Sequence, residues 1–239
     1  TYPGYATTVP DFIKSKEDYN ETSGYSEGLL TYFPDWSNTA LKDFILIFFS
    51  EFAKRYDDDP RMAFLEVGFG LWAEYHIYDP GLELGINFPD MQYQREFITH
   101  LSETYNSLKW LISIDSADSE TAPFKNTPGL KDFVFGLFDD SFLHEEHDSY
   151  NKDCFDFFGK EKRMTAPIGG EFSYYTDYDQ QHVLDLPNGP HGITYEEMAA
   201  IYNVTFMIGA DQPEYQSWER IKEAGIASGY NFKILSFKA

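Results

Sequence analysis

The stretch from Met62 to His76, MAFLEVGFGLWAEYH, decides how the rest of the chain is interpreted. Its first part, Met62 to Gly70, is a short apolar run of the kind that forms a buried strand. Its second part, Leu71 to His76, collects polar and aromatic side chains directly after that run. The stretch therefore predicts a buried strand that leads into a loop of functional residues.

Further strand-like runs follow, and carboxylates stand at or near the end of each. They are Leu108 to Ser116 with Asp115, Asp132 to Phe142 with Asp139 and Asp140, Met164 to Tyr175 with Glu171, and Val204 to Tyr215 with Asp211 and Glu214. Helical patterns are found at Ser37 to Tyr56, Met91 to Tyr105, Tyr195 to Tyr202 and Ser217 to Ser228. This alternation predicts βαβ units and a parallel sheet.

Carboxylates at the ends of successive strands are typical of a (β/α)8 barrel, whose active site is built at that face. We therefore predict an α/β fold of (β/α)8 TIM-barrel-like type, incomplete at its N-terminus because only five or six strands can be counted. The predicted organisation is an irregular N-terminal segment over 1–36, a barrel catalytic domain over 37–230, and the start of a further β segment over 231–239.

Charge and composition exclude several classes of partner. The formal net charge is -22, from 40 acidic and 18 basic residues, which disfavours nucleic acid and anionic membranes. The absence of an apolar run of about 20 residues argues against membrane insertion. The single Cys154 excludes an intrachain disulfide and a multi-cysteine metal site. Nothing in the sequence indicates the oligomeric state.

The aromatic content points to a different partner. Aromatic residues make up 18% of the chain, with 18 Tyr, 22 Phe and 4 Trp. Most Phe residues are expected in the core, whereas aromatic side chains beside carboxylates suit the apolar C–H faces of sugar rings. The sequence therefore favours a carbohydrate partner.

Two glutamates are the candidate catalytic residues. Glu74 follows Gly70 and Trp72, and desolvation of such a carboxyl would make it a proton donor. Glu171 follows two glycines at the end of a strand-like run, which indicates a carboxylate presented through a tight backbone passage. The alternatives are a strand end with an amphipathic belt for Glu74 and a surface turn for Glu171.

These motifs resemble those of a known group of proteins. The pattern Gly-x-Trp-x-Glu-x-His, preceded by Arg-Tyr-Asp-x-Asp-Pro-Arg and followed by Gly-Gly-Glu, resembles bacterial (β/α)8 barrel proteins grouped with glycoside hydrolases. The similarity covers roughly Asp35 to Tyr215. Ala73 departs from it where a Gly is expected, and Tyr75 stands in place of a Trp.

The resemblance implies Glu74 as acid/base and Glu171 as nucleophile, and a secreted or periplasmic protein. The interval of 97 residues between the two glutamates fits three βα units. Candidate substrate-binding residues are Trp72, Tyr75, His76, Asp115, Asp140, His144, Tyr175 and Asp211.

No organic cofactor and no catalytic metal are predicted. His144 and His147 leave a metal site as the less favoured alternative to a polar substrate-side loop, because their spacing differs from that of zinc peptidases. A structural calcium ion stays open, although the acidic run Asp57 to Pro60 is better explained as a solvated turn.

The predicted function is hydrolysis of a poly- or oligosaccharide by paired carboxylates. Whether the reaction retains or inverts the anomeric configuration is left open, because it depends on the separation of the carboxyl groups. The alternatives are a carbohydrate-binding barrel without activity and a polysaccharide lyase that uses Tyr and His.

Overall fold

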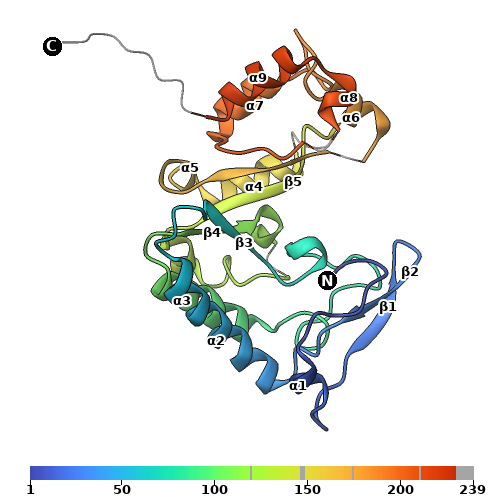
Figure 1. The fold of residues 1–239 in the computed structure, drawn as a ribbon, viewed down its shortest axis with the longest axis vertical. Coiled ribbons are helices and arrows are strands. Elements are labelled where there is room, and N and C mark those ends of the chain that lie inside the picture. Colours follow the sequence, from blue (N-terminus) through green and yellow to red (C-terminus); the bar gives the residue numbers. More distant parts are fainter. Residues whose placement is uncertain (119, 146–148, 174, 210, 230–239) are drawn as a thin grey trace, which may run out of the picture. The chain divides into compact units, whose positions relative to one another are not determined.

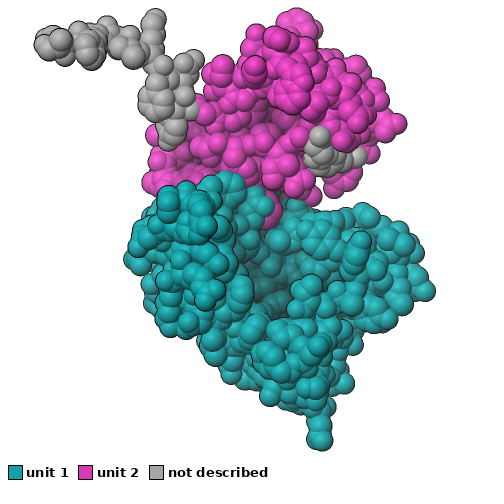
Figure 2. Space-filling view, in the orientation of Figure 1, with its two compact units in different colours: residues 1–136 teal, residues 137–239 magenta. Residues whose placement is uncertain are grey.

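The computed structural model describes residues 1–118, 120–145, 149–173, 175–209 and 211–229. The chain divides into two compact units, Thr1–Gly136 (unit 1) and Leu137–Ala239 (unit 2), which Figure 2 distinguishes by colour. The predicted β segment over 231–239 and His147 lie outside the described residues.

Unit 1 combines a hairpin, two long helices and a pair of parallel strands (Figure 1). Its elements are α1 (Asp11–Lys14), β1 (Thr22–Ser26), β2 (Leu29–Phe33), α2 (Thr39–Tyr56), β3 (Phe64–Val67), α3 (Met91–Thr104) and β4 (Lys109–Ser113), with 3-10 helices η1 (Leu71–Ala73), η2 (Ile114–Ala117) and η3 (Pro128–Asp132). Strands β1 and β2 pair antiparallel. Residues 1–36, for which the sequence predicts an irregular segment, thus contain α1 and a hairpin.

The parallel pair β3 and β4 brings two strand ends to one edge. Phe64 pairs with Lys109, and Val67 pairs with Ile112. Helices α2 and α3 begin at side-chain caps, with Asn38 accepting from the Leu41 N–H and Asp90 accepting from the N–H groups of Gln92 and Tyr93. Helix α2 meets α3 through the rings of Phe49 and Phe97, whose centroids are 5.2 Å apart. Apolar packing between helices α2 and α3 therefore stabilises unit 1. The loops that carry Glu74 and Asp115 follow β3 and β4.

Unit 2 contains a second parallel pair with short helices. Its elements are β5 (Gly136–Phe142), α4 (Tyr150–Phe158), α5 (Lys162–Thr165), β6 (Ile168–Phe172), α6 (Asp177–His182), α7 (Tyr195–Tyr202), α8 (Gln212–Tyr215) and α9 (Trp218–Ala227). Strands β5 and β6 run parallel, with an irregularity between Asp139 and Phe142. Helix α7 begins at a capping box, in which Thr194 and Glu197 bond each other's backbone N–H.

The predicted (β/α)8 barrel is wrong. The described residues form six strands, of which four lie in parallel pairs and two form an antiparallel hairpin. The run from Val204 to Tyr215, predicted as a strand, is bonded to β6 through the N–H groups of Thr205 and Ile208 and forms an isolated bridge from Ile208 to Glu171; its last residues form the short helix α8. Pro213 helps to explain the difference, because it lacks the N–H that a strand ladder needs and is tolerated in the first turn of a helix.

No described helix is both long and apolar enough to cross a membrane.

Candidate functional site

The loop after β3 folds back on itself through its own backbone. The N–H groups of Phe69 and Gly70 donate to the Glu74 carbonyl oxygen at 3.2 and 2.8 Å, and the N–H of Leu71 donates to the His76 carbonyl oxygen at 3.1 Å. These hydrogen bonds tie both functional residues to the strand end. The positions of Glu74 and His76 are therefore set by the main chain.

The two glycines of this loop are required by close backbone approach. A Cβ atom on Gly68 would lie 1.7 Å from the Ala73 carbonyl oxygen, and one on Gly70 would lie 2.2 Å from the His76 carbonyl oxygen. No larger residue fits there without moving the backbone. Gly68 and Gly70 thus allow the tight fold of the loop.

Two consecutive residues before Glu74 adopt left-handed backbone angles. Trp72 has a φ of 52° and Ala73 a φ of 66°. This conformation costs a non-glycine residue about 1–2 kcal/mol, and such strain is concentrated at functional sites. Ala73 is the position where the sequence analysis expects a Gly, and a Gly adopts a positive φ without this cost.

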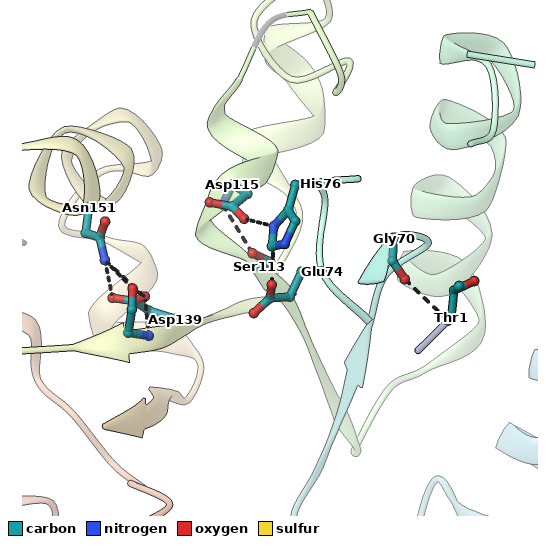
Figure 3. Close-up of polar contacts among 9 residues, drawn as sticks. Thr1, Gly70, Glu74, His76, Ser113, Asp115, Asp139 and Asn151 are labelled. Atoms are coloured by element: carbon teal, nitrogen blue, oxygen red, sulfur yellow. Dashed lines mark hydrogen bonds and ion pairs between the residues drawn. The ribbon is translucent and has the colours of Figure 1, made fainter. Parts of the chain in front are cut away.

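Glu74, His76 and Asp115 form one cluster (Figure 3). His76 Nδ1 lies 2.7 Å from Asp115 Oδ2 and 3.3 Å from Glu74 Oε2. Asp115 reaches the cluster from η2, directly after β4, and its N–H donates to Ser113 Oγ at 3.2 Å. Because β3 and β4 are parallel, their C-terminal ends lie at the same edge, which is where the sequence places these residues.

Burial differs within this cluster. Glu74 is 2% exposed, whereas the side chains of His76 and Asp115 are 24% and 20% exposed. One imidazole therefore faces a buried carboxylate and a partly exposed one. An imidazole held at Nδ1 by a carboxylate has a fixed orientation and tautomer, as a general acid or base requires.

The same three residues could hold a metal ion. Each offers one ligand atom, and the three atoms lie within 4.8 Å of one another. One imidazole nitrogen and two carboxylate oxygens are donors that suit zinc or manganese. The cluster is thus chemically suited either to proton transfer or to a divalent cation.

An aromatic surface borders the cluster. The Tyr78 ring stacks on the His76 ring at 4.8 Å and 16°, and its centroid lies 6.0 Å from that of Trp72. Tyr78 is 56% exposed, so it offers a face to a ligand. The sequence prediction includes Trp72 and His76 but misses Tyr78. An aromatic residue only two positions after His76 is the sequence feature that could have pointed to it.

Tyr75 lies away from that surface. It is 1% exposed and packs against Phe69 and Phe88, with ring centroids 5.7 and 5.6 Å away. Burial raises the pKa of its phenol above the usual value. Although the sequence prediction assigns Tyr75 to substrate binding, the structure places it in the core.

Glu171 lies in unit 2, on β6. A Cβ atom on Gly170 would stand 1.7 Å from the Asp139 carbonyl oxygen, so the passage before Glu171 is as tight as the sequence indicates. Burial, and then the nearby charge of Asp140, raise the pKa of Glu171. This environment disfavours the ionised form of Glu171. Glu74 and Glu171 belong to different units.

Comparisons with protein-family models, with curated proteins and with solved structures find no match to this chain. The resemblance to barrel glycoside hydrolases therefore stays a prediction. The function must be inferred from the geometry of the site.

The remaining predicted residues of unit 2 lie at its surface or in its polar contacts. Tyr175 is 68% exposed, and its ring lies 4.8 Å from that of His144. Asp211 accepts a hydrogen bond from Gln180 Nε2 at 2.5 Å. Asp140 is half-buried beside Glu171.

Sequence reasoning misses a second histidine and carboxylate pair in unit 2. His191 Nε2 lies 2.5 Å from Asp179 Oδ1, and Ser173 Oγ donates to Asp179 Oδ2 at 3.1 Å. Asp179 is 2% exposed. Neither residue stands in a motif, and the 12 positions between them follow no helical or strand period, so the sequence carries no signal for this pair.

Proposed function

We propose that this chain hydrolyses glycosidic bonds and that Glu74, His76 and Asp115 supply its acid/base chemistry. The observation that carries this proposal is the position of His76 Nδ1 between two carboxylates, 2.7 Å from Asp115 and 3.3 Å from Glu74. The exposed ring of Tyr78, stacked on His76, supports a sugar as the ligand.

The difference in burial supports a distinct role for each carboxylate. Asp115 is the more exposed of the two, so it is the group that reaches the glycosidic oxygen and donates the proton. Glu74 is the second, buried carboxylate of the pair. One oxygen from each lies within 4.8 Å of the other, which is shorter than the separation of about 6.5–9.5 Å in an inverting pair. Retention of the anomeric configuration is therefore the expected outcome.

The proposal changes the pair that the sequence suggests. There Glu74 is combined with Glu171, whereas the contacts within unit 1 combine Glu74 with Asp115. His76 orients both groups through Nδ1. Glu171 is not required for this chemistry.

The test is a panel of oligosaccharides and aryl glycosides, hydrolysed by the parent chain and by two matched variants. Asp115→Asn should lower kcat/KM by about 10²–10⁴-fold, the usual contribution of a general acid or base. Asp118→Asn makes the same change three residues along the chain, at an exposed position, and should leave kcat/KM unchanged. Failure of the parent to hydrolyse any glycan that it binds would overturn the proposal in favour of a non-catalytic binder.

A chelator distinguishes proton transfer from metal chemistry at the same residues. If the three side chains act as acids and bases, dialysis against EDTA leaves the turnover unchanged. If activity is lost and returns with manganese or zinc, the three residues are metal ligands and the acid/base assignment is wrong.

A further inference from the structure

A cavity of about 300 Å³ lies in unit 1, apart from the Glu74 cluster. Its wall includes Trp36, Leu41, Ile45, Phe49, Val67 and Phe69, from the segment before α2, from α2 itself and from β3 with its loop. Neither Glu74, His76 nor Asp115 lines it. Small-molecule sites have volumes from about 300 Å³ upwards and mostly apolar walls with a few polar groups.

One polar group in this wall lacks a partner. Trp36 is 4% exposed, and its indole Nε1–H has no hydrogen-bond acceptor within the described part of the chain. A buried donor left without an acceptor costs about 1–3 kcal/mol. An oxygen atom supplied by a ligand would recover this energy.

The charge around the cavity limits what enters it. Glu66 lies on the cavity wall and is exposed, and the chain carries a net charge of -22. Both disfavour an anion, and the Thr1 ammonium in the same wall is bound to the Gly70 carbonyl oxygen at 3.4 Å. The apolar wall also disfavours a cation or a strongly hydrated molecule, because it offers no interaction that offsets the free-energy cost of removing a charge from water.

We propose that this cavity binds a small uncharged molecule with an aromatic or branched aliphatic body and one hydrogen-bond acceptor for Trp36 Nε1–H. The site is separate from the proposed acid/base cluster and goes beyond the proposed function. It touches the same loop, however, because Gly68 and Ala73 line it. Its occupant therefore contacts the backbone that positions Glu74.

Two compounds of the same shape test the acceptor. Acetophenone carries a carbonyl oxygen where isopropenylbenzene carries a methylene group. Titrations followed by the indole N–H resonances of ¹⁵N-labelled protein should show both compounds binding, with acetophenone tighter by about tenfold. Acetophenone should also shift the Trp36 signal, which is assigned by its loss in Trp36→Phe, and that variant should bind the two compounds equally.

Cavity filling tests the location. Ile45→Phe and Val9→Phe each add volume to the cavity wall and should abolish binding. Ile47→Phe makes the first change on the same helix at a residue that is 61% exposed and does not line the cavity, so it should bind as the parent does. Circular dichroism identifies any variant that fails to fold. If one of the two cavity-filling variants does not fold, binding to the other tests the location of the site.

Three results would overturn the proposal. One is the absence of binding of either compound to the parent at millimolar concentration. Another is equal binding of the two compounds to the parent. The third is binding to a folded Ile45→Phe or Val9→Phe variant with parent affinity.

Discussion

The loop of unit 1 that carries Glu74 and the strand of unit 2 that carries Glu171 share a close backbone approach at a glycine. They differ in the charged group that lies beside the glutamate. In each, a glycine lets two backbone segments approach so closely that a Cβ atom would stand 1.7 Å from a carbonyl oxygen, at Gly68 and at Gly170. Glu74 then faces an imidazole, whereas Glu171 has Asp140 as its nearby charge. Glycines before a glutamate therefore predict a close approach of two backbone segments, but they do not predict which charged group lies beside the carboxylate.

The largest expected difference follows from removing the imidazole. His76→Ala leaves the buried Glu74 and the carboxylate of Asp115 without the ring between them, and we expect the free energy of unfolding to fall by about 2–3 kcal/mol. His182→Ala breaks an exposed pair with Asp185 and should cost less than about 1 kcal/mol. Urea unfolding of both variants measures this, and equal losses would contradict a special role for His76.

The strained loop gives a smaller effect of opposite sign. Ala73→Gly replaces a residue at φ 66° by one that adopts this angle freely, and the free energy of unfolding should rise by up to about 1 kcal/mol. Ala53→Gly, inside helix α2, should lower it by about 1 kcal/mol. Thermal unfolding that shows the two variants shifted in the same direction would refute the backbone strain at Ala73.

The smallest effect concerns Glu171 and depends on pH. Its raised pKa means that the folded state holds the proton more tightly than the unfolded state, so stability falls as pH rises above the ordinary value of 4.5. Glu171→Gln removes this loss. We expect the variant and the parent to unfold at similar temperatures at pH 4 and the variant to unfold at the higher temperature at pH 8. A gap that does not change with pH would contradict the raised pKa.

Helices and buried strands are the features that sequence patterns predict well here. The structure contains α2, α3, α7 and α9 within two residues of their predicted bounds, because apolar period and caps agree at each. Strands β3, β4, β5 and β6 lie inside the predicted apolar runs. The barrel fails because a short apolar run does not fix pairing, as Val204 to Tyr215 demonstrates with a single bridge and a helix.

The site is only partly predictable for a related reason. Residues at the ends of adjacent parallel strands must lie near one another, which is why His76 and Asp115 can be expected together. The direction of each side chain in an irregular loop depends on angles such as the φ of 52° at Trp72, which no residue type dictates. Tyr75, which the sequence assigns to substrate binding, therefore lies in the core, whereas Tyr78, for which the sequence makes no prediction, is exposed.

The measurement that most directly tests the acid/base assignment compares two leaving groups in Asp115→Asn. A 2,4-dinitrophenyl glycoside needs no proton to depart, whereas a methyl glycoside does. With Asp115 as the proton donor, the variant should lose about 10²–10⁴-fold in kcat/KM on the methyl glycoside and keep the dinitrophenyl rate within about tenfold of the parent. Equal losses on both substrates, or none on either, would contradict the assignment.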